Sequence, residues 1–262
     1  MPFTLAHPAA VLPLRRIRFL RAAPLVIGAV TPDVPYYLPL GASGHPLRVG
    51  LDTHSLVSAC TVDLALGVAL LAVAVLLREP LTALLPARAR WLCLEGLEPF
   101  RRRPIEWLLA PLAILIGVYS HLLWDSFTHA DGWGVRHIPA LEAKVTIGWY
   151  SGDVFHILQY LSSALGLAVL AWWYARQRVP PDILAADDSR RAHAGPALLL
   201  IAGAALLIGG VEALRYYSHS EGAVYQTLDL LLTRGLAWFV LLHLFAGAVV
   251  TLEHRSGAAR HQ

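Results

Sequence analysis

The most distinctive feature of the sequence is a run of metal-ligand side chains at helical spacing, His121-Leu-Leu-Trp-Asp125-Ser-Phe-Thr-His129. On an α-helix, residues four positions apart lie on one face, with Cβ atoms about 6 Å apart. Imidazole nitrogens and carboxylate oxygens both bind divalent cations such as zinc. The spacing therefore predicts a metal site on this stripe. The alternative is a helix end at which His and Asp only cap and hydrogen-bond.

Further ligand-type residues occur in three other short motifs. His137 follows the stripe and is an additional candidate ligand. His54 lies in the sequence DTHS at 52–55, at the start of an apolar run, where Asp or Thr could cap a helix. Capping does not explain why a His enters an apolar run, so His54 is a candidate ligand. In TPDVP at 31–35, Asp33 lies between two prolines, where a helix would break. Its carboxylate could be a metal ligand, a general base or part of a turn.

Weaker candidates lie elsewhere in the chain. Asp153 and His156 are three residues apart, although a helix N-terminus favours Asp for dipole reasons alone. Glu212 lies in an apolar run and could pair with Arg215 one turn later. His7 precedes Pro8, and its role depends on the side of the membrane on which the N-terminus lies.

The composition predicts a membrane protein. Apolar residues make up 56% of the 262 residues and charged residues only 15%, outside the usual balance of soluble domains. A helix needs roughly 20 apolar residues to cross a bilayer. Six candidate spans predict a single all-α polytopic helical bundle over residues 1–262: 22–40, 54–77, 105–124, 154–174, 195–214 and 235–252. The first contains Asp33 between prolines, which indicates a broken or re-entrant segment.

The distribution of basic residues predicts the orientation. If all six segments cross, 16 Arg residues fall on one side and five Arg or Lys on the other. The positive-inside rule then places both termini in the cytoplasm, in a bacterial inner membrane, and the His and Asp cluster at the outer face. Alternatively, residues 3–14 form the first arm of a hairpin that turns at residues 15–21. That arrangement would place His7 and the N-terminus outside.

Several functional classes do not fit the composition. Two Cys residues, Cys60 and Cys93, exclude a disulfide scaffold and a cysteine-built zinc finger. The net charge of +3 with one Lys gives no polybasic surface, so nucleic acid is not an expected partner. No phosphate-binding glycine loop or nucleophile elbow is present.

Four motifs also carry a family resemblance. MPFTLAHPAAVLPLRR, GAVTPDVPYYLP, THSL and GVYSHLLWDSFTHADGW occur in this order over about the first 160 residues. In order and spacing they resemble an uncharacterised family of bacterial integral-membrane proteins known as a domain of unknown function. More distantly, the succession is similar to predicted membrane-bound metal-dependent hydrolases and to the zinc-dependent phospholipase C group.

The resemblance implies a set of metal ligands. These are His7, Asp33, His54, His121 and Asp125, with His129 or His137 in addition. The chain departs from the pattern because Asp33 is followed by Val-Pro-Tyr, without a second acidic residue and His, and because a later HxxxE or HxxxD is absent. A mononuclear or dinuclear site is therefore expected in place of a full multinuclear zinc centre.

These observations predict a membrane-embedded hydrolase that uses a divalent metal, zinc by preference. The expected substrate is an ester or phosphodiester bond of a lipid or lipid-linked molecule at the outer face, with Asp33 or Asp125 as ligand or general base. Two alternatives remain open. One is a non-catalytic membrane protein with a structural His and Asp cluster, and the other is a transporter of metal ions or protons.

Overall fold

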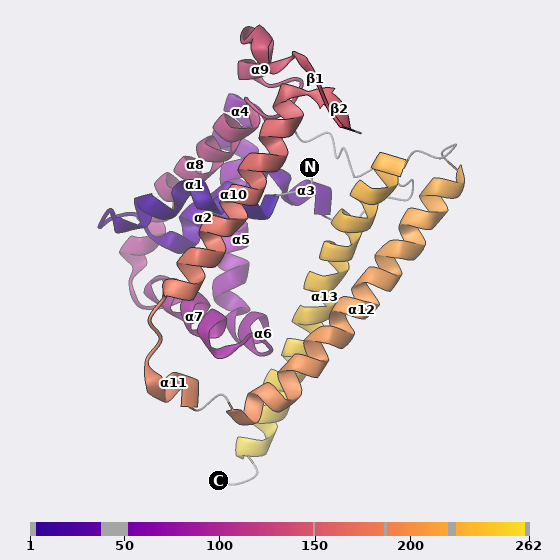
Figure 1. Cartoon of the computed structure of the whole chain (residues 1–262). Helices are drawn as coiled ribbons and strands as arrows, with labels where there is room; N and C mark the ends of the chain where they lie inside the picture. The colour runs from indigo at the N-terminus through magenta and orange to yellow at the C-terminus, as the bar shows by residue number, and fades with distance from the viewer. Residues whose placement is uncertain (1–3, 38–51, 149, 186–187, 220–223, 260–262) are drawn as a thin grey trace.

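The computed structural model describes residues 4–37, 52–148, 150–185, 188–219 and 224–259, and these residues are almost entirely helical (Figure 1). The elements, in chain order, are η1 (Thr4–Ala6), α1 (Pro8–Val11), η2 (Leu12–Arg16), α2 (Ala22–Val30), η3 (Thr31–Asp33), α3 (Val34–Tyr37), α4 (Leu56–Ser58), the π-helical turn η4 (Ala59–Asp63), α5 (Leu64–Leu76), α6 (Arg78–Thr82), α7 (Ala87–Arg102), α8 (Pro104–Asp125), α9 (Trp133–His137), η5 (Pro139–Leu141), β1 (Lys144–Ile147), β2 (Tyr150–Asp153), α10 (Val154–Arg176), α11 (Pro181–Ala185), α12 (Asp188–His219) and α13 (Val224–Ala259). The two strands pair antiparallel as a hairpin, with Lys144 opposite Asp153.

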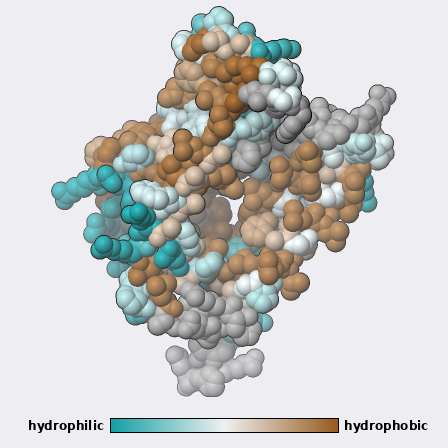
Figure 2. Space-filling view, in the orientation of Figure 1, coloured by the Kyte–Doolittle hydropathy of each residue, from teal (hydrophilic) through white to brown (hydrophobic). Residues whose placement is uncertain are grey.

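Five helical segments of the described chain are long and apolar enough to cross a membrane. They are Leu56–Leu76, Pro104–Asp125, Val154–Arg176, Ala194–Ser218 and Leu230–Glu253. Their outward surfaces are apolar: Leu161, Leu199 and Phe245 are 64%, 75% and 72% exposed. Figure 2 shows hydrophobic residues covering much of the visible surface. The protein is therefore a multi-pass, all-α membrane protein, and the five segments coincide with five of the six expected spans.

The sixth expected span, residues 22–40, has a different structure. Its described part consists of the nine-residue α2, the turn η3 and the four-residue α3. Pro32 has no N–H to donate to the carbonyl four residues earlier, so α2 ends before the turn that carries Asp33. At 1.5 Å per residue, α2 is only about 14 Å long, too short to cross a bilayer. Residues 38–40 lie outside the described chain.

Residues 4–37 fold as a hairpin against α8, the chain course expected in the alternative arrangement of the N-terminal segment. His7 and Asp33 both reach the C-terminal end of α8, at 3.0 Å from Asp125 and 3.6 Å from His121. Between them along the chain, Arg21 donates a 2.8 Å hydrogen bond to Glu106 in the first turn of α8. The chain thus leads away from the end of α8 and returns to it. His7 therefore lies at the opposite end of α8 from Arg21.

Helix α8 is the centre of the packing. One buried cluster, which includes Leu25, Ala29 and Ala113, joins it to α2. A second joins it to α5 and α7 through residues such as Leu71, Phe100 and Ile114. Glycine permits the close approach of α2, because a Cβ on Gly28 would lie 2.1 Å from the Ile114 carbonyl oxygen. This contact fixes α2 and the Asp33 turn against α8.

Helices α12 and α13 pair with each other as a long hairpin beside the rest of the molecule (Figure 1). The pair of α12 and α13 packs mainly on α6, where a Cβ on Gly247 of α13 would lie 2.0 Å from the Pro80 carbonyl oxygen. Glu212 joins the two helices: it accepts a hydrogen bond from Trp238 Nε1 at 2.9 Å, and Arg234 Nε lies 3.5 Å away. The expected partner of Glu212 was Arg215. In the structure, the partners of Glu212 are instead residues of α13. The spacing along one helix cannot predict a contact with another helix.

Candidate metal centre

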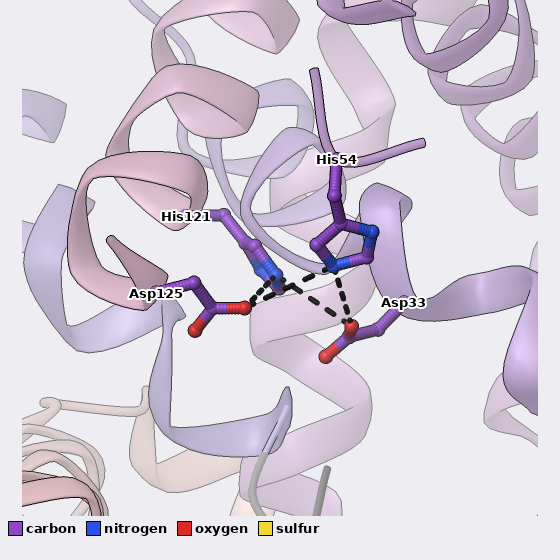
Figure 3. Close-up of side chains that lie close together, drawn as sticks. All are labelled: Asp33, His54, His121 and Asp125. Carbon is purple, nitrogen blue, oxygen red and sulfur yellow. Dashed lines mark ion pairs between the residues drawn. The ribbon is translucent and has the colours of Figure 1, made fainter. Parts of the chain in front are cut away.

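Four side chains from separate parts of the chain converge at one end of α8. They are Asp33 from η3, His54 from the segment before α4, and His121 and Asp125 from α8, and Figure 3 shows them pointing toward one another. One ligand atom from each lies within 4.8 Å of all the others. His121 is fully buried, Asp33 is 1% exposed and Asp125 7% exposed, whereas His54 is half-buried. The cluster could hold a metal ion.

The hydrogen bonds of His121 direct its free nitrogen into the cluster. Nδ1 lies 2.8 Å from the carbonyl oxygen of Ala29 in α2. Because a carbonyl only accepts hydrogen bonds, Nδ1 carries the proton. In the neutral ring, Nε2 then has a free lone pair. That Nε2 faces Asp125 Oδ2 at 3.2 Å and Asp33 Oδ1 at 3.6 Å and has no hydrogen-bond partner among the described residues.

The same arrangement recurs at His54. Thr53 Oγ1 donates its proton to the Pro32 carbonyl at 2.9 Å, so it accepts from His54 Nδ1 at 3.2 Å. His54 Nε2 is left buried without a hydrogen-bond partner, 3.3 Å from Asp33 Oδ1. Ser55 caps the following helix through a reciprocal pair of hydrogen bonds with Ser58. The cap on α4 is therefore Ser55, while Thr53 ties the His54 segment to the Asp33 turn.

The charges of the cluster favour a cation. Asp33 and Asp125 are two buried carboxylates. Within the described chain, only histidines form ion pairs with them at 4.0 Å or less. A buried carboxylate is costly unless an opposite charge compensates it. When both imidazoles are neutral, their Nε2 lone pairs face the two carboxylates and are repelled by them. A divalent cation between them removes this repulsion and satisfies both nitrogen lone pairs and the unpartnered Asp33 Oδ1.

The distances also fit a first-row metal. Zinc bonds of about 2.0–2.2 Å to N and O imply neighbouring tetrahedral ligand atoms about 3.3–3.6 Å apart. The four His-to-Asp distances in the cluster are 3.2, 3.3, 3.6 and 3.8 Å. Small side-chain movements would therefore bring His54, His121, Asp33 and Asp125 around one ion.

A relay of hydroxyl groups orients Asp33. Thr4 Oγ1 donates a 2.5 Å hydrogen bond to Asp33 Oδ2. Having used its proton, Thr4 Oγ1 accepts from the Tyr37 hydroxyl at 2.7 Å. The relay holds Oδ2 and leaves Oδ1 directed at the two histidines. Thr4 and Tyr37 were not among the predicted site residues, because neither belongs to a recognisable ligand spacing.

Replacing Thr4 with Val is expected to weaken metal binding about 10- to 100-fold, the range typical of lost outer hydrogen bonds to metal ligands. Valine keeps the shape of the buried Thr4 but cannot donate to Asp33. Equilibrium dialysis against zinc with a competing chelator measures the change. Thr61→Val is the matched control, since exposed Thr61 bonds only the Val57 and Ser58 carbonyls of the preceding helical turn. Equal affinities in the Thr4 variant and the wild type would contradict the role of the relay.

His7 lies at the edge of the four-residue cluster. Its Nδ1 is 3.3 Å from the Thr4 carbonyl, its Nε2 is 3.0 Å from Asp125 Oδ1, and its ring stacks on His121 at 3.9 Å. The hairpin fold of the N-terminal segment brings it there. His7 therefore contacts Asp125 Oδ1, whereas Oδ2 faces His54 and His121. A direct bond from His7 to the metal remains a proposal.

His129 faces the same Asp125 oxygen as His7. Its Nδ1 is 3.4 Å from Asp125 Oδ1, and Gln159 from α10 donates its amide to Nε2 at 3.1 Å. Since Nε2 accepts, Nδ1 carries the proton toward Asp125. Burial lowers the pKa of His129 below its ordinary value, against the opposing effect of Asp125. These contacts place His129 beside Asp125, where a role as ligand or as orienting group remains a proposal, and they add Gln159, which no sequence pattern indicated.

The remaining sequence candidates lie apart from the cluster. His137 is exposed, stacks on Trp133 at 4.6 Å and bonds the Trp133 carbonyl through Nδ1 at 2.7 Å. Asp153 and His156 form a partly exposed pair at 3.9 Å. In the described chain, none of these three belongs to a group able to hold one ion.

Asp63 is a further buried carboxylate that the sequence reading did not identify. It is fully buried in the π-helical turn η4; Oδ2 accepts from Ser58 at 3.1 Å and Oδ1 has no partner in the described chain. Such turns are frequent at functional sites. Through Ser58 and its cap partner Ser55, Asp63 supports the segment that carries His54.

A cavity of about 640 Å³ opens beside the cluster. His54, Asp125 and His129 line it together with leucines, Tyr119, Trp133 and Arg136. A ligand in this cavity would therefore reach the cluster directly.

Comparison with known proteins identifies the family. The family model described as "Domain of unknown function (DUF4184)" matches residues 1–252. A search of curated proteins and a search of solved structures found no match. The matched region includes the N-terminal hairpin, all four cluster residues and the five candidate spans except the last residue, Glu253. The chain therefore belongs to the DUF4184 family.

Proposed function

We propose that this protein is a membrane-embedded, metal-dependent hydrolase that cleaves a phosphodiester or ester bond of a lipid or lipid-linked substrate. The observation that carries the proposal is the convergence of three buried, unpartnered ligand atoms, on Asp33, His54 and His121, beside a cavity. The two-histidine, two-carboxylate set favours zinc among common divalent ions. His7 is a further candidate ligand.

Bound zinc would supply Lewis acidity and a water of lowered pKa, as it does in other zinc hydrolases. For a phosphodiester, the water oxygen bonds to phosphorus, the bond from phosphorus to the lipid alcohol breaks, and the alcohol takes a proton. The products are a phosphomonoester and an alcohol. Asp33 is not among the residues that line the cavity, and its Oδ2 accepts a hydrogen bond from Thr4. Its Oδ1 remains available, so Asp33 serves as a ligand.

Asp125 is the carboxylate best placed to handle the proton. It lines the cavity, whereas Asp33 does not. Its Oδ2 faces His121, and its Oδ1 lies within 3.4 Å of both His7 and His129. His7 Nδ1 faces the Thr4 carbonyl, which leaves Nε2 able to accept a proton from Asp125, whereas His129 already carries its proton on the nitrogen that faces Asp125. Asp125 is therefore the proposed general base as well as a ligand, with His7 as the next proton acceptor.

The proposed location is a bacterial plasma membrane with the site at the outer face. Arg21 of the N-terminal hairpin turn bonds Glu106 at the start of α8, and α6, α7 and the C-terminal end of α13 lie in the lower part of Figure 1; these segments carry many of the arginines. The positive-inside rule places that end in the cytoplasm. The metal centre and the N-terminal segment then face the opposite side, where outer-leaflet lipids are within reach.

The test is a hydrolysis assay on the purified full-length protein in lipid vesicles. Vesicles contain phosphatidylethanolamine, phosphatidylglycerol and cardiolipin, and mass spectrometry follows release of diacylglycerol, phosphorylated head groups and fatty acids. Zinc-loaded protein should release product, chelated protein should not, and reloading should restore release. Stable metal binding without product from any of these lipids would contradict the hydrolase proposal and favour a structural metal site.

A further inference from the structure

The cavity beside the cluster has two chemically different linings. Tyr119, Leu122 and Leu123 lie on one face of α8, at spacings of three and four residues, and Leu56 from α4 adds to them. Leu56 and Leu123 are 72% and 64% exposed. Both lie at the site end of candidate membrane spans. This lining is therefore continuous with surface that faces the hydrocarbon of the bilayer.

The other lining comes from the segment that follows α8, and it carries one charge of each sign. Arg136 and Asp131 both line the cavity, and both are exposed. In the described chain, neither side chain has an ion-pair partner within 4.0 Å, and Asp131 does not cap α9. Arg136 is the only Arg or Lys among the residues described as lining the cavity.

The segment that carries these two charges is packed firmly against the end of α8. Val135 is 1% exposed, and its N–H donates to the Ser126 carbonyl at 3.2 Å. A Cβ on Gly132 would lie 2.4 Å from that same carbonyl oxygen, and one on Gly134 would lie 2.5 Å from the Phe127 ring. The close packing holds Asp131 and Arg136 at the cavity and fixes their backbone positions relative to Asp125.

We infer that the cavity binds an aminophospholipid, a lipid whose head group carries a phosphate and a primary ammonium. Arg136 binds the phosphate, Asp131 binds the ammonium, and the acyl chains lie along the lining formed by Leu56 and Leu123. Guanidinium groups suit phosphate because they donate paired hydrogen bonds. This inference rests on the proposed function for the reaction, and it adds the class of substrate and two specificity-determining residues.

A lipid explains the lining better than a soluble phosphate ester does. A soluble ester has no acyl chains to occupy the lining of Leu56 and Leu123, whereas the acyl chains of a lipid enter it directly from the bilayer. The opposite charges of Asp131 and Arg136 match a zwitterionic head group, whereas a purely anionic head group would meet repulsion from Asp131. The cluster residues Asp125 and His129 line the same cavity, so a phosphate held there lies beside the proposed metal.

Lipid binding to the metal-depleted full-length protein in detergent tests the inference without turnover. Native mass spectrometry compares short-chain phosphatidylethanolamine, phosphatidylglycerol with the same acyl chains, and chain-free glycerophosphoethanolamine. The wild type should bind phosphatidylethanolamine about 10-fold more tightly than either other ligand, about the effect of one charge-assisted hydrogen bond. Equal or tighter binding of phosphatidylglycerol would overturn the head-group assignment. Equal binding of the chain-free compound would overturn the lipid assignment.

Two variants separate the roles of the charges. Arg136→Gln should weaken both phospholipids about 10-fold, because both carry the phosphate, and Arg136→Lys should restore part of the loss. Asp131→Asn should weaken phosphatidylethanolamine alone. Lys144→Gln, an exposed cation on β1 outside the cavity lining, is the matched control and should change nothing. Unchanged binding in Arg136→Gln would overturn the inference.

Failure of this inference and failure of the hydrolase proposal are distinguishable. Binding is measured without metal, so selective lipid binding can be present even if no lipid is hydrolysed. Conversely, hydrolysis that is unaffected by Arg136→Gln and Asp131→Asn would leave the hydrolase proposal standing and reject the two residues as specificity determinants. Both side chains are exposed, and unchanged thermal unfolding temperatures confirm that the variants fold.

Discussion

Replacing His121 with Ala is expected to lower zinc affinity about 100- to 1,000-fold. Structural zinc sites with four ligands bind with about 10–16 kcal/mol, or roughly 2.5–4 kcal/mol for each ligand. His121 is fully buried, and its Nε2 faces both carboxylates of the cluster. Competition with a chelator of known affinity, read by elemental mass spectrometry of the dialysed protein, measures the loss.

The control for this variant is His137→Ala. His137 was also a predicted ligand, but it is exposed and bonds only within α9. It should keep wild-type affinity. Because a cavity at His121 could also destabilise α8 against α2, the thermal unfolding temperature of each variant is measured without metal. Wild-type zinc affinity in a folded His121→Ala protein would show that the cluster is not the metal site.

Replacing Asp125 with Asn is expected to reduce product formation about 10²- to 10⁴-fold, the typical contribution of a general base. The amide keeps the size of the carboxylate but loses its charge and can no longer accept a proton. It also disturbs the contacts with His7, His121 and His129. Rates are measured in the vesicle assay at saturating zinc, so that weaker metal binding does not limit the rate.

Asp153→Asn provides the matched comparison for Asp125. Asp153 is a carboxylate on the same side of the molecule, but its ion pair is with His156, away from the cluster. Its variant should retain the wild-type rate. If Asp125→Asn with full zinc occupancy hydrolyses lipid as fast as the wild type, Asp125 has no role in proton transfer.

Sequence patterns were sufficient to predict the membrane class and the central stripe. Apolar runs of about 20 residues have few structural alternatives, so five expected spans coincide with long helices. His121 and Asp125 converge because residues four positions apart lie on the same face of a helix. Asp33 and His54 were also singled out, since ionisable residues at breaks or starts of apolar runs require an explanation.

The assignment of roles within the site depended on tertiary contacts. His129 continues the stripe at the same spacing, yet α8 ends at Asp125, so His129 follows a turn and meets Gln159 from α10. Thr4, Gln159 and Asp63 are ordinary polar residues in sequence, and only packing makes them neighbours of ligands. The hairpin that carries His7 could not be distinguished from a cytoplasmic tail, because both give the same count of basic residues on each side.

The central claim is that His54, His121, Asp33 and Asp125 bind one divalent metal ion. Elemental mass spectrometry of the detergent-purified wild type, combined with X-ray absorption at the metal edge, tests it most directly. We expect about one equivalent of zinc per chain, with two imidazole ligands and oxygen ligands at about 2.0–2.2 Å. Protein that retains no metal after reconstitution with zinc or manganese would contradict it, as would a metal shell without imidazole.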